Sequence, residues 1–545
     1  MAELTFRNLG SVRKALEEAI RTDASTAKSV VPRYVELRPG IQDRLEAERH
    51  HLLTGRRGTG KSTLLHVLRQ HLGSDDVPVA TLDMERFNGR EYPDVLIQVL
   101  IELLREIKPS LDARHIPSRL RLRSRLGRLQ SVLTTMLSDP QLMTRTLTRS
   151  RSKEATAGAD ATTQAMYKAQ RAKAQMRISR SSGENLKTEG TFEELKIQRL
   201  QALASDISAL LGDVIRDSTG GHAVVFLDDY YFVPYKDQPA VLGYLHQVCK
   251  GTGVWLKVGG VGSRLNPYVD GTPPTGMELG HEISEVALDV TLADFNTAKR
   301  FLEDVLRGVL NPITTPEELF TADARDRMVL ACGGAVARDY ITLTGSALDE
   351  AVERIGRDGP YKSDDFIKIW TQDIQTAAKK QMNTKEQEAF QRDATSDAST
   401  LSNRWRDICD FIRVTTDLFI LVPQADLERE PWGKEIQQLE NLRLLHRIKD
   451  TIPNSRSWQG VKTMVFMIDL GQLPNVRLSK KIPEFWKSAS DFNILRKGAW
   501  VYTPDWMVRK REIEAATAKF EKGEPAADEV ALFDYDQVDS ASDVR

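Results

Sequence analysis

The chain has 545 residues, a formal net charge of -1, and a composition that is 41% hydrophobic and 28% charged. This length exceeds what one hydrophobic core organises, so we expect roughly two to four domains. The three cysteines show no metal-ligand or CxxC spacing, which excludes a thiolate metal site and favours a reducing compartment. The N-terminus lacks the apolar segment of a signal peptide, and the apolar runs fall well short of the ~20 residues that span a bilayer. We therefore expect a cytoplasmic protein with no membrane partner.

The first chemical pattern lies between an expected strand at 50–53 and an expected helix at 62–72. Glycines in such a pattern let backbone N–H groups point at phosphates, a lysine reaches the β- and γ-phosphate oxygens, and a hydroxyl binds Mg²⁺. The residues that fit GxxxxGK[ST] are Gly55, Arg56, Arg57, Gly58, Thr59, Gly60, Lys61 and Ser62. With Thr63, they predict a P-loop that binds ATP, and the flanking strand and helix distinguish it from an accidental glycine-rich turn.

A second strand is expected at 77–87, followed by an apolar-faced helix at 92–107 and a central parallel strand at 222–227. Asp228 and Asp229 follow that last strand, where open α/β sheets place their ligands. We assign Asp228, with Ser62, to Mg²⁺, and Asp229 to the catalytic water. The alternatives are a turn acid for Asp228 and a helix cap for Asp229.

The next expected strand is GVWLKVGGVGSR, which ends in Ser263 and Arg264. In P-loop ATPases built in this way, a polar or basic residue at this point senses the γ-phosphate, so Arg264 is a catalytic candidate. A surface cation beside a flexible glycine loop is the alternative for Arg264.

An arginine-rich stretch precedes the acidic strand, within an expected basic and partly flexible insertion at about 112–195. Its arginines suit contact with a phosphate backbone, although a run of charge is more often a solvated helix face. The arginines in question are Arg119, Arg121, Arg123, Arg125 and Arg128.

Three segments together resemble the AAA+ ATPases, most closely the origin-recognition initiator-like branch with its bacterial and archaeal members. They are ELRPGIQDRLEAERHHLLTGRRGTGKSTLL, LDDYYFVPYKDQPAVLGYLHQVCKG and LACGGAVARDYITLTGSAL, within roughly residues 30–350. The resemblance implies an α/β P-loop NTPase with a parallel sheet, a helical lid, and ATP and Mg²⁺ as cofactors. In such lids the arginine of a GG-x-x-x-R element reaches back to the phosphates. Gly333, Gly334 and Arg338 match it, and a solvent-facing arginine is the alternative for Arg338.

Two features depart from the pattern of these ATPases. Many members carry glutamate where this chain has Asp229, whose side chain is one methylene shorter. The sequence also offers no convincing arginine finger, the residue that a neighbouring subunit would insert. Whether hydrolysis requires a homo-oligomer therefore stays open.

The C-terminal part predicts a helix at 403–413, a strand at 418–422, a longer helix at 434–450 and a hairpin at 462–470. This order is compatible with a winged helix, which the initiator relatives also carry after their lid. Arg443 and Arg447 share one face of the expected long helix, and that face is suited to enter a DNA groove. The alternative is a solvated face paired with Glu440, in a domain that binds protein.

The expected division of the chain follows from these assignments. It comprises an N-terminal helical segment (1–47), the AAA+ core (48–285), the lid (286–381), a linker (382–402), the winged-helix-like domain (403–511) and an acidic tail (512–545). The function predicted is an ATPase switch that couples nucleotide state to DNA association through 403–511 and the basic insertion. The alternative is a STAND-like signalling or assembly ATPase, of mobile-element or phage-defence type, that acts on protein partners.

Overall fold

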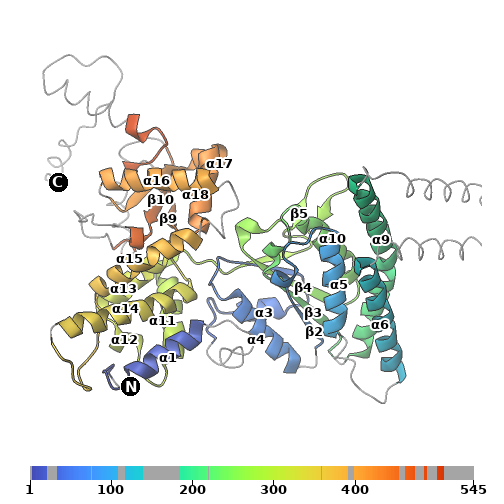
Figure 1. The fold of residues 1–545 in the computed structure, drawn as a ribbon, viewed down its shortest axis with the longest axis horizontal. Coiled ribbons are helices and arrows are strands. Elements are labelled where there is room, and N and C mark those ends of the chain that lie inside the picture. Colours follow the sequence, from blue (N-terminus) through green and yellow to red (C-terminus); the bar gives the residue numbers. More distant parts are fainter. Residues whose placement is uncertain are drawn as a thin grey trace, which may run out of the picture. The chain divides into compact units, whose positions relative to one another are not determined.

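The computed structural model describes residues 3–20, 34–74, 77–107, 117–138, 185–218, 220–357, 359–388, 390, 398–415, 417–452, 461–472, 484–487 and 500–508. The chain forms two compact units (Figure 1). The first unit is Arg38–Leu288, and the second unit combines Met1–Leu37 with Asp289–Arg545. The N-terminal residues thus group with the lid and the C-terminal domain. The centre of the basic insertion and the acidic tail lie outside the described residues.

The first unit contains a five-stranded parallel sheet with the order β2-β3-β4-β1-β7. Its β3 is an unbroken run of buried apolar side chains up to the terminal aspartate, as expected for a parallel strand covered on both faces. Because all strands are parallel, their carboxyl ends lie along one edge of the sheet. The strands are β1 (His51–Thr54), β2 (Val79–Asp83), β3 (Ala223–Asp228), β4 (Val254–Gly260) and β7 (Ser284–Ala287).

Helices cover both faces of this sheet. One face shares a continuous apolar core with α5 (Asp94–Ile107), α6 (Pro117–Ser138), α9 (Asn185–Asp217) and α10 (Gln238–Cys249). On the opposite face, α4 (Lys61–Ser74) packs against the three strands β2, β3 and β4. The short helix α3 (Ile41–Glu46) precedes β1 and contacts α4. The first unit is thus an α/β structure with a parallel sheet, as the sequence predicts, and its helices form a layer on each face of the sheet.

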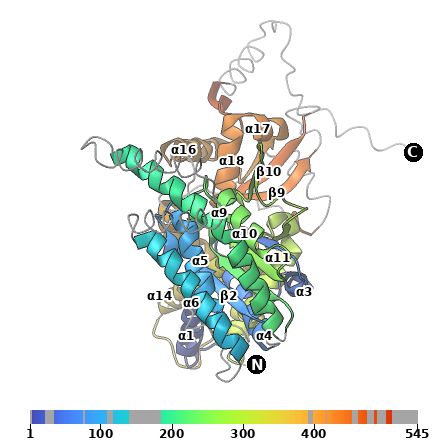
Figure 2. The ribbon, with the colours of Figure 1, turned by 90° about the vertical axis from the view of Figure 1, so that its right-hand side faces the viewer.

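The arginine-rich helix α6 is a packing helix. Its leucines recur at helical spacing and are buried against α9, which runs beside it (Figure 2). Two of its arginines are held by acids of α9: Arg119 Nε lies 2.5 Å from the Asp217 carboxylate, and Arg125 pairs with Asp213. Of the five arginines that suit contact with a phosphate backbone, Arg119 and Arg125 thus have counter-charges supplied by α9.

The second unit begins with a group of helices in the range expected to form the lid. The N-terminal helix α1 (Leu9–Ile20) contacts α11 (Phe295–Leu310) and α14 (Ala337–Arg357). The other members are α12 (Pro316–Leu319), α13 (Ala322–Cys332) and α15 (Thr371–Glu388). Helix α15 extends into the expected linker at 382–402, and α16 already begins at Ala398.

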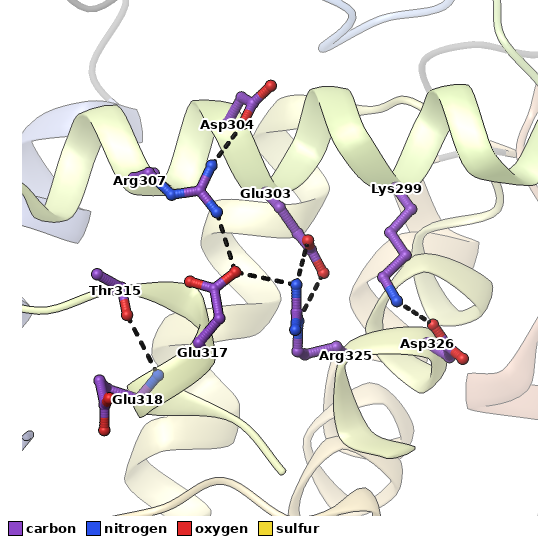
Figure 3. Close-up of polar contacts among 9 residues, drawn as sticks. All are labelled: Lys299, Glu303, Asp304, Arg307, Thr315, Glu317, Glu318, Arg325 and Asp326. Atoms are coloured by element: carbon purple, nitrogen blue, oxygen red, sulfur yellow. Dashed lines mark hydrogen bonds and ion pairs between the residues drawn. The ribbon is translucent and has the colours of Figure 1, made fainter. Parts of the chain in front are cut away.

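An ion-pair network joins three of these helices (Figure 3). Arg325 on α13 donates from Nε and Nη2 to the Glu303 carboxylate on α11, at 2.8 and 2.6 Å. The same Nη2 also lies 3.0 Å from Glu317 on α12, which accepts from Arg307 at 2.9 Å. Since Glu303 is 6% exposed, this bidentate pair is shielded from solvent and fixes α13 against α11.

The C-terminal part follows a helix–strand–helix–helix–hairpin order. Its four-stranded sheet has the order β11-β8-β10-β9, and β10 is antiparallel to both β8 and β9. The elements are α16 (Ala398–Thr415), β8 (Phe419–Pro423), α17 (Gln424–Arg429), α18 (Pro431–Asn441), β9 (Leu445–Ile452), β10 (Thr463–Ile468), η8 (Leu470–Gln472) and β11 (Trp500–Val501).

The prediction of a single long helix at 434–450 is wrong. Helix α18 ends at Asn441, Arg443 adopts a left-handed conformation with φ 63°, and β9 follows. Arg443 and Arg447 therefore do not share a helical face. Both are held by acids, since Arg443 pairs with Asp339 and Arg447 lies 2.7 Å from the Glu440 carboxylate.

Within the described ranges, no helix has the length and apolar character that crossing a bilayer requires. Cys249 and Cys332 are buried and Cys409 is half-buried, all as free thiols. Burial raises the pKa of the Cys249 thiol to about 12, which makes this thiol unreactive at neutral pH.

Candidate nucleotide site

The loop from Gly55 to Gly60 curls between β1 and α4. Gly58 and Gly60 have φ values of 87° and 95°, a left-handed region that favours glycine. A Cβ on Gly55 would lie 2.7 Å from Thr59 Oγ1 and 3.3 Å from Leu288 Cβ, so a side chain would not fit there. Thr59 closes the loop because its hydroxyl donates to Arg56 O at 2.9 Å. The glycines of the predicted P-loop thus occupy positions that need glycine.

Lys61 is the cation inside this loop. Its side chain is 5% exposed, and Nζ donates to the carbonyl oxygens of Gly55 at 2.7 Å and Arg56 at 3.0 Å. Arg56 is also buried, at 4% exposed, whereas Arg57 points to solvent and its charge acts on Asp229. A buried ammonium within an arc of loop backbone is the arrangement that binds a phosphate group.

Asp228 lies at the end of β3, at the same edge of the sheet as the P-loop. Ser62 on α4 donates a hydrogen bond to its carboxylate, and Lys61 is a nearby positive charge. Burial, reinforced by the charge of Asp229, nevertheless raises the pKa of Asp228 to about 6. A carboxylate whose ionised form is disfavoured in this way is stabilised by a bound cation.

Asp229 follows in a left-handed conformation, with φ 53°, that only a few residue types tolerate. Burial raises the pKa of Asp229, while Lys61, Arg57 and a hydrogen bond from Tyr231 oppose this shift. Asp229 thus follows β3 in a left-handed conformation and lies within the electrostatic reach of Lys61.

Arg264 is linked to this acid through one aromatic ring. It ends η5 (Gly262–Arg264) after β4, and its guanidinium carbon lies 4.5 Å from the centre of the Tyr231 ring. Tyr231 in turn hydrogen-bonds to Asp229. The structure therefore brings together the acid pair after β3 and the basic residue after β4, with Tyr231 between them.

Two further residues at this edge of the sheet, Gln238 and Asp83, were not predicted from the sequence. Gln238, 1% exposed, donates to the carbonyl oxygens of Val233 and Arg264 at 3.0 Å and accepts from Asn266 N at 2.7 Å. It thereby ties the loop after β3 to the loop after β4. No sequence signal marks a glutamine at the start of a helix for such a role.

Asp83 is the second residue at this edge that was not predicted. It ends β2, and its Cα is the register partner of Asp228. Its charge raises the pKa of Asp229, and its carboxylate accepts from Glu85 N at 3.0 Å. The rule that identified Asp228, an acid at the carboxyl end of a parallel strand, would also have identified Asp83.

Arg338 belongs to the second unit, where it is the second residue of α14. The turn before it contains Gly333, the left-handed C-cap of α13, and Gly334, with φ values of 66° and 125°. The reach of Arg338 to the phosphates stays an expectation from the resemblance.

The residues gathered at the sheet edge fit a magnesium–nucleotide pair. Hard oxygen donors, the Ser62 hydroxyl and the Asp228 carboxylate, are the ligand types that Mg²⁺ takes in proteins. The N-terminus of α4, which begins at Lys61, would add its partial positive charge to a phosphate held in this loop.

Comparisons with known proteins identify similar solved structures. No protein-family model matches the chain, and no curated protein matches it. The structures include Cdc6p from Pyrobaculum aerophilum (12% identity, 83% of this chain and 91% of the other, TM-score 0.28). A second is ORC1 from Aeropyrum pernix in complex with DNA, with 12% identity, coverage of 84% of this chain and 93% of the other, and a TM-score of 0.31. A third is ORC2 from Aeropyrum pernix in its ADP form, with 12% identity, coverage of 88% of this chain and 93% of the other, and a TM-score of 0.27.

Proposed function

We propose that the chain is an ATP-binding and ATP-hydrolysing AAA+ switch. The observation that carries this proposal is the convergence of the P-loop with the end of β3, joined by the Ser62–Asp228 hydrogen bond. A buried lysine, a helix N-terminus and a cation-demanding carboxylate meet at one edge of a parallel sheet. This combination is suited to a triphosphate with its metal.

Each residue has a separate role in the proposed site. The backbone N–H groups of Gly55–Thr63 bind the phosphate oxygens, and Lys61 exchanges its two carbonyl partners for the β- and γ-phosphates. Ser62 and Asp228 hold Mg²⁺, which when bound neutralises charge that develops on the transferred phosphoryl group. Asp229 orients the attacking water and accepts its proton.

Arg264 is proposed to act on the γ-phosphate from the end of β4. Its contact with the Tyr231 ring supports this proposal, because Tyr231 also hydrogen-bonds to Asp229. Arg338 is proposed to read the nucleotide from the lid. The alternatives, a surface cation for Arg264 and a solvent-facing helix residue for Arg338, are tested by substitution.

We propose that the C-terminal domain is a winged helix. The order α16, β8, α17, α18 and the hairpin β9–β10 supports this assignment. Helix α18 would then be the element that enters a DNA groove, and Lys434 and Gln437 lie on its exposed face. Nucleotide state would control association of this domain with duplex DNA.

A second candidate is a signalling or assembly ATPase that acts on protein partners. It is favoured by the ion pairs that occupy several arginines expected to meet phosphates: Arg119, Arg125, Arg443 and Arg447. An arginine already paired with a carboxylate has to give up that partner to bind DNA. Self-association and a cytoplasmic location stay predictions in either case.

One experiment distinguishes the two candidates. ATP turnover and binding are measured without nucleic acid and with duplex DNA, single-stranded DNA or RNA, each at low and physiological salt. The DNA-coupled switch predicts duplex affinity that falls steeply with salt, because several phosphate contacts release counterions. No duplex affinity, together with an ATP-dependent increase in mass by size-exclusion chromatography, would instead support the partner-binding ATPase.

A further inference from the structure

Contacts from the C-terminal domain hold the lid turn that carries Arg338. This lid turn, Gly333–Asp339, links the end of α13 to the start of α14. Asp339 directly follows Arg338, and Gly333 lies five residues before it. Asp339 and Gly333 both contact residues of the α18–β9 segment. The lid arginine is therefore bracketed by a domain more than one hundred residues further along the chain.

The first contact is an ion pair. Arg443 Nη1 lies 2.6 and 2.5 Å from the two carboxylate oxygens of Asp339, in the first turn of α14. The two side chains are only 14% and 25% exposed, so solvent screens the pair less than it would at an open surface. Arg443 reaches Asp339 from a left-handed backbone conformation at the end of α18.

The second contact is a close approach of the His446 ring to Gly333. His446 is fully buried, and a Cβ at position 333 would lie 2.0 Å from its Nδ1 and 2.1 Å from its Cε1. The ring cannot give way easily, because its Nε2 lies 3.1 Å from Asp469 Oδ2. Asp469 is itself fixed, since its backbone N donates to Leu444 O and its Oδ1 accepts from Gly471 N.

The lid turn is also tied to the lid itself. Ala335 N donates to Val290 O at 2.8 Å, and Gly333 N donates to Leu330 O at 3.2 Å. The first residues of a helix lack intrahelical partners for their N–H groups, so the start of α14 depends on outside contacts for its position. Asp339, in this first turn, also interacts favourably with the positive end of the α14 helix dipole, and the ion pair with Arg443 fixes the position of Asp339.

We propose that Arg443 and His446 are positioning residues for Arg338, so that the C-terminal domain sets nucleotide turnover. This inference rests on the proposed function, because it requires Arg338 to act on the nucleotide. Coupling is reciprocal: a partner that displaces β9 changes ATP affinity, and ATP changes the affinity for that partner by the same factor.

The test is a double-mutant cycle on the full-length chain, read as kcat and KM for ATP without any partner. Arg338→Ala, Arg443→Ala and the double variant are compared. Arg443→Ala should shift the same kinetic parameter as Arg338→Ala, in the same direction, by roughly fivefold or more. The double variant should be no worse than Arg338→Ala alone, because both changes remove one function. Combining Arg443→Asp with Asp339→Arg, which reverses the ion pair, should recover part of the loss.

A matched control separates positioning from loss of stability. Arg404→Ala removes another half-buried arginine–carboxylate pair of the same domain, to Glu435 at 2.7 Å, and both Glu435 and a second partner of Arg404, Tyr502, belong to the C-terminal domain itself. It should lower the melting temperature yet leave kcat and KM at wild-type values. If Arg443→Ala does not fold, Asp339→Asn takes its place in the cycle, since it weakens the same pair with little change in shape.

The outcomes separate the two claims. Wild-type kinetics in Arg443→Ala, or additive losses in the double variant, overturn this inference while Arg338 keeps its role. Wild-type kinetics in Arg338→Ala overturn the role of Arg338 and this inference with it. A wild-type chain that does not hydrolyse ATP overturns the proposed function itself.

Discussion

Ser62 and Asp228 are hydrogen-bonded to each other, although one belongs to the first helix after the P-loop and the other ends β3. The bond joins the two oxygen donors assigned to Mg²⁺. In this position the ionised form of Asp228 is disfavoured by burial, and a divalent cation would offset this cost.

Asp228→Asn should leave nucleotide binding nearly intact and remove magnesium-dependent turnover. The amide keeps the shape of the carboxylate but loses the charge that holds the metal. Loss of one such group from a charge-stabilising site lowers kcat by roughly 100-fold or more. Labelled-ATP hydrolysis, with equilibrium binding measured in parallel, checks the prediction. Unimpaired hydrolysis would refute the metal assignment.

Asp229→Asn should lower kcat by roughly 100-fold or more with little effect on ATP affinity, because general-base action is lost. Asparagine is the suitable replacement, since it tolerates the left-handed conformation with φ 53°. Asp229→Gly, which also fits that backbone, serves as the control for strain. A rate near wild type in both variants would show that Asp229 has no catalytic role.

Apparent affinity for Mg²⁺ should fall as the pH drops below about 6. The folded, metal-free protein has an Asp228 pKa of about 6, so a proton competes with the metal below that value. Because the pKa of Asp228 is raised in the folded protein, the metal-free fold loses stability as the pH rises through about 6 and Asp228 ionises. Bound Mg²⁺ stabilises the ionised carboxylate and removes this loss. Half-saturating Mg²⁺ for ATP turnover, measured from pH 5 to 8, checks this. A constant half-saturating concentration across that range would contradict the prediction.

Arg264→Ala should lower kcat, and Tyr231→Phe should lower it less. The phenylalanine ring retains the face on which the Arg264 guanidinium rests at 4.5 Å but loses the hydroxyl that bonds to Asp229. Steady-state kinetics of both variants, with Tyr235→Phe as an exposed control, measure the two effects. A wild-type rate in Arg264→Ala would show that this arginine is a surface cation with no role in catalysis.

The P-loop and the acids after β3 were predictable because their chemistry is local in the sequence. A glycine-rich loop between a strand and a helix, and an apolar strand that ends in aspartates, each follow from short stretches. The parallel sheet was predictable for the same reason. Gln238 was not, because it acts through two loops that only the folded sheet brings together.

The end of α18 was missed for a different physical reason. Leu439, Leu442, Leu445 and Ile448 recur at a spacing that also suits a helix, and no glycine or asparagine marks the left-handed turn at Arg443. In α6 the many arginines concealed the leucine spacing that packs this helix against α9. Ion pairs to distant acids, such as Arg443–Asp339, have no signature in the sequence.

The most direct measurement is isothermal titration calorimetry of the full-length chain with Mg·ATP, repeated on Lys61→Ala. The wild type should bind with a measurable heat and a stoichiometry of about one, as the single P-loop implies. Lys61→Ala should abolish tight binding, because the phosphates lose the buried ammonium, whereas Lys250→Ala, at an exposed position of the same unit, should bind like the wild type. A flat trace for the folded wild type, or equal affinity in Lys61→Ala, would contradict the claim that the P-loop and Asp228 form one Mg·ATP site.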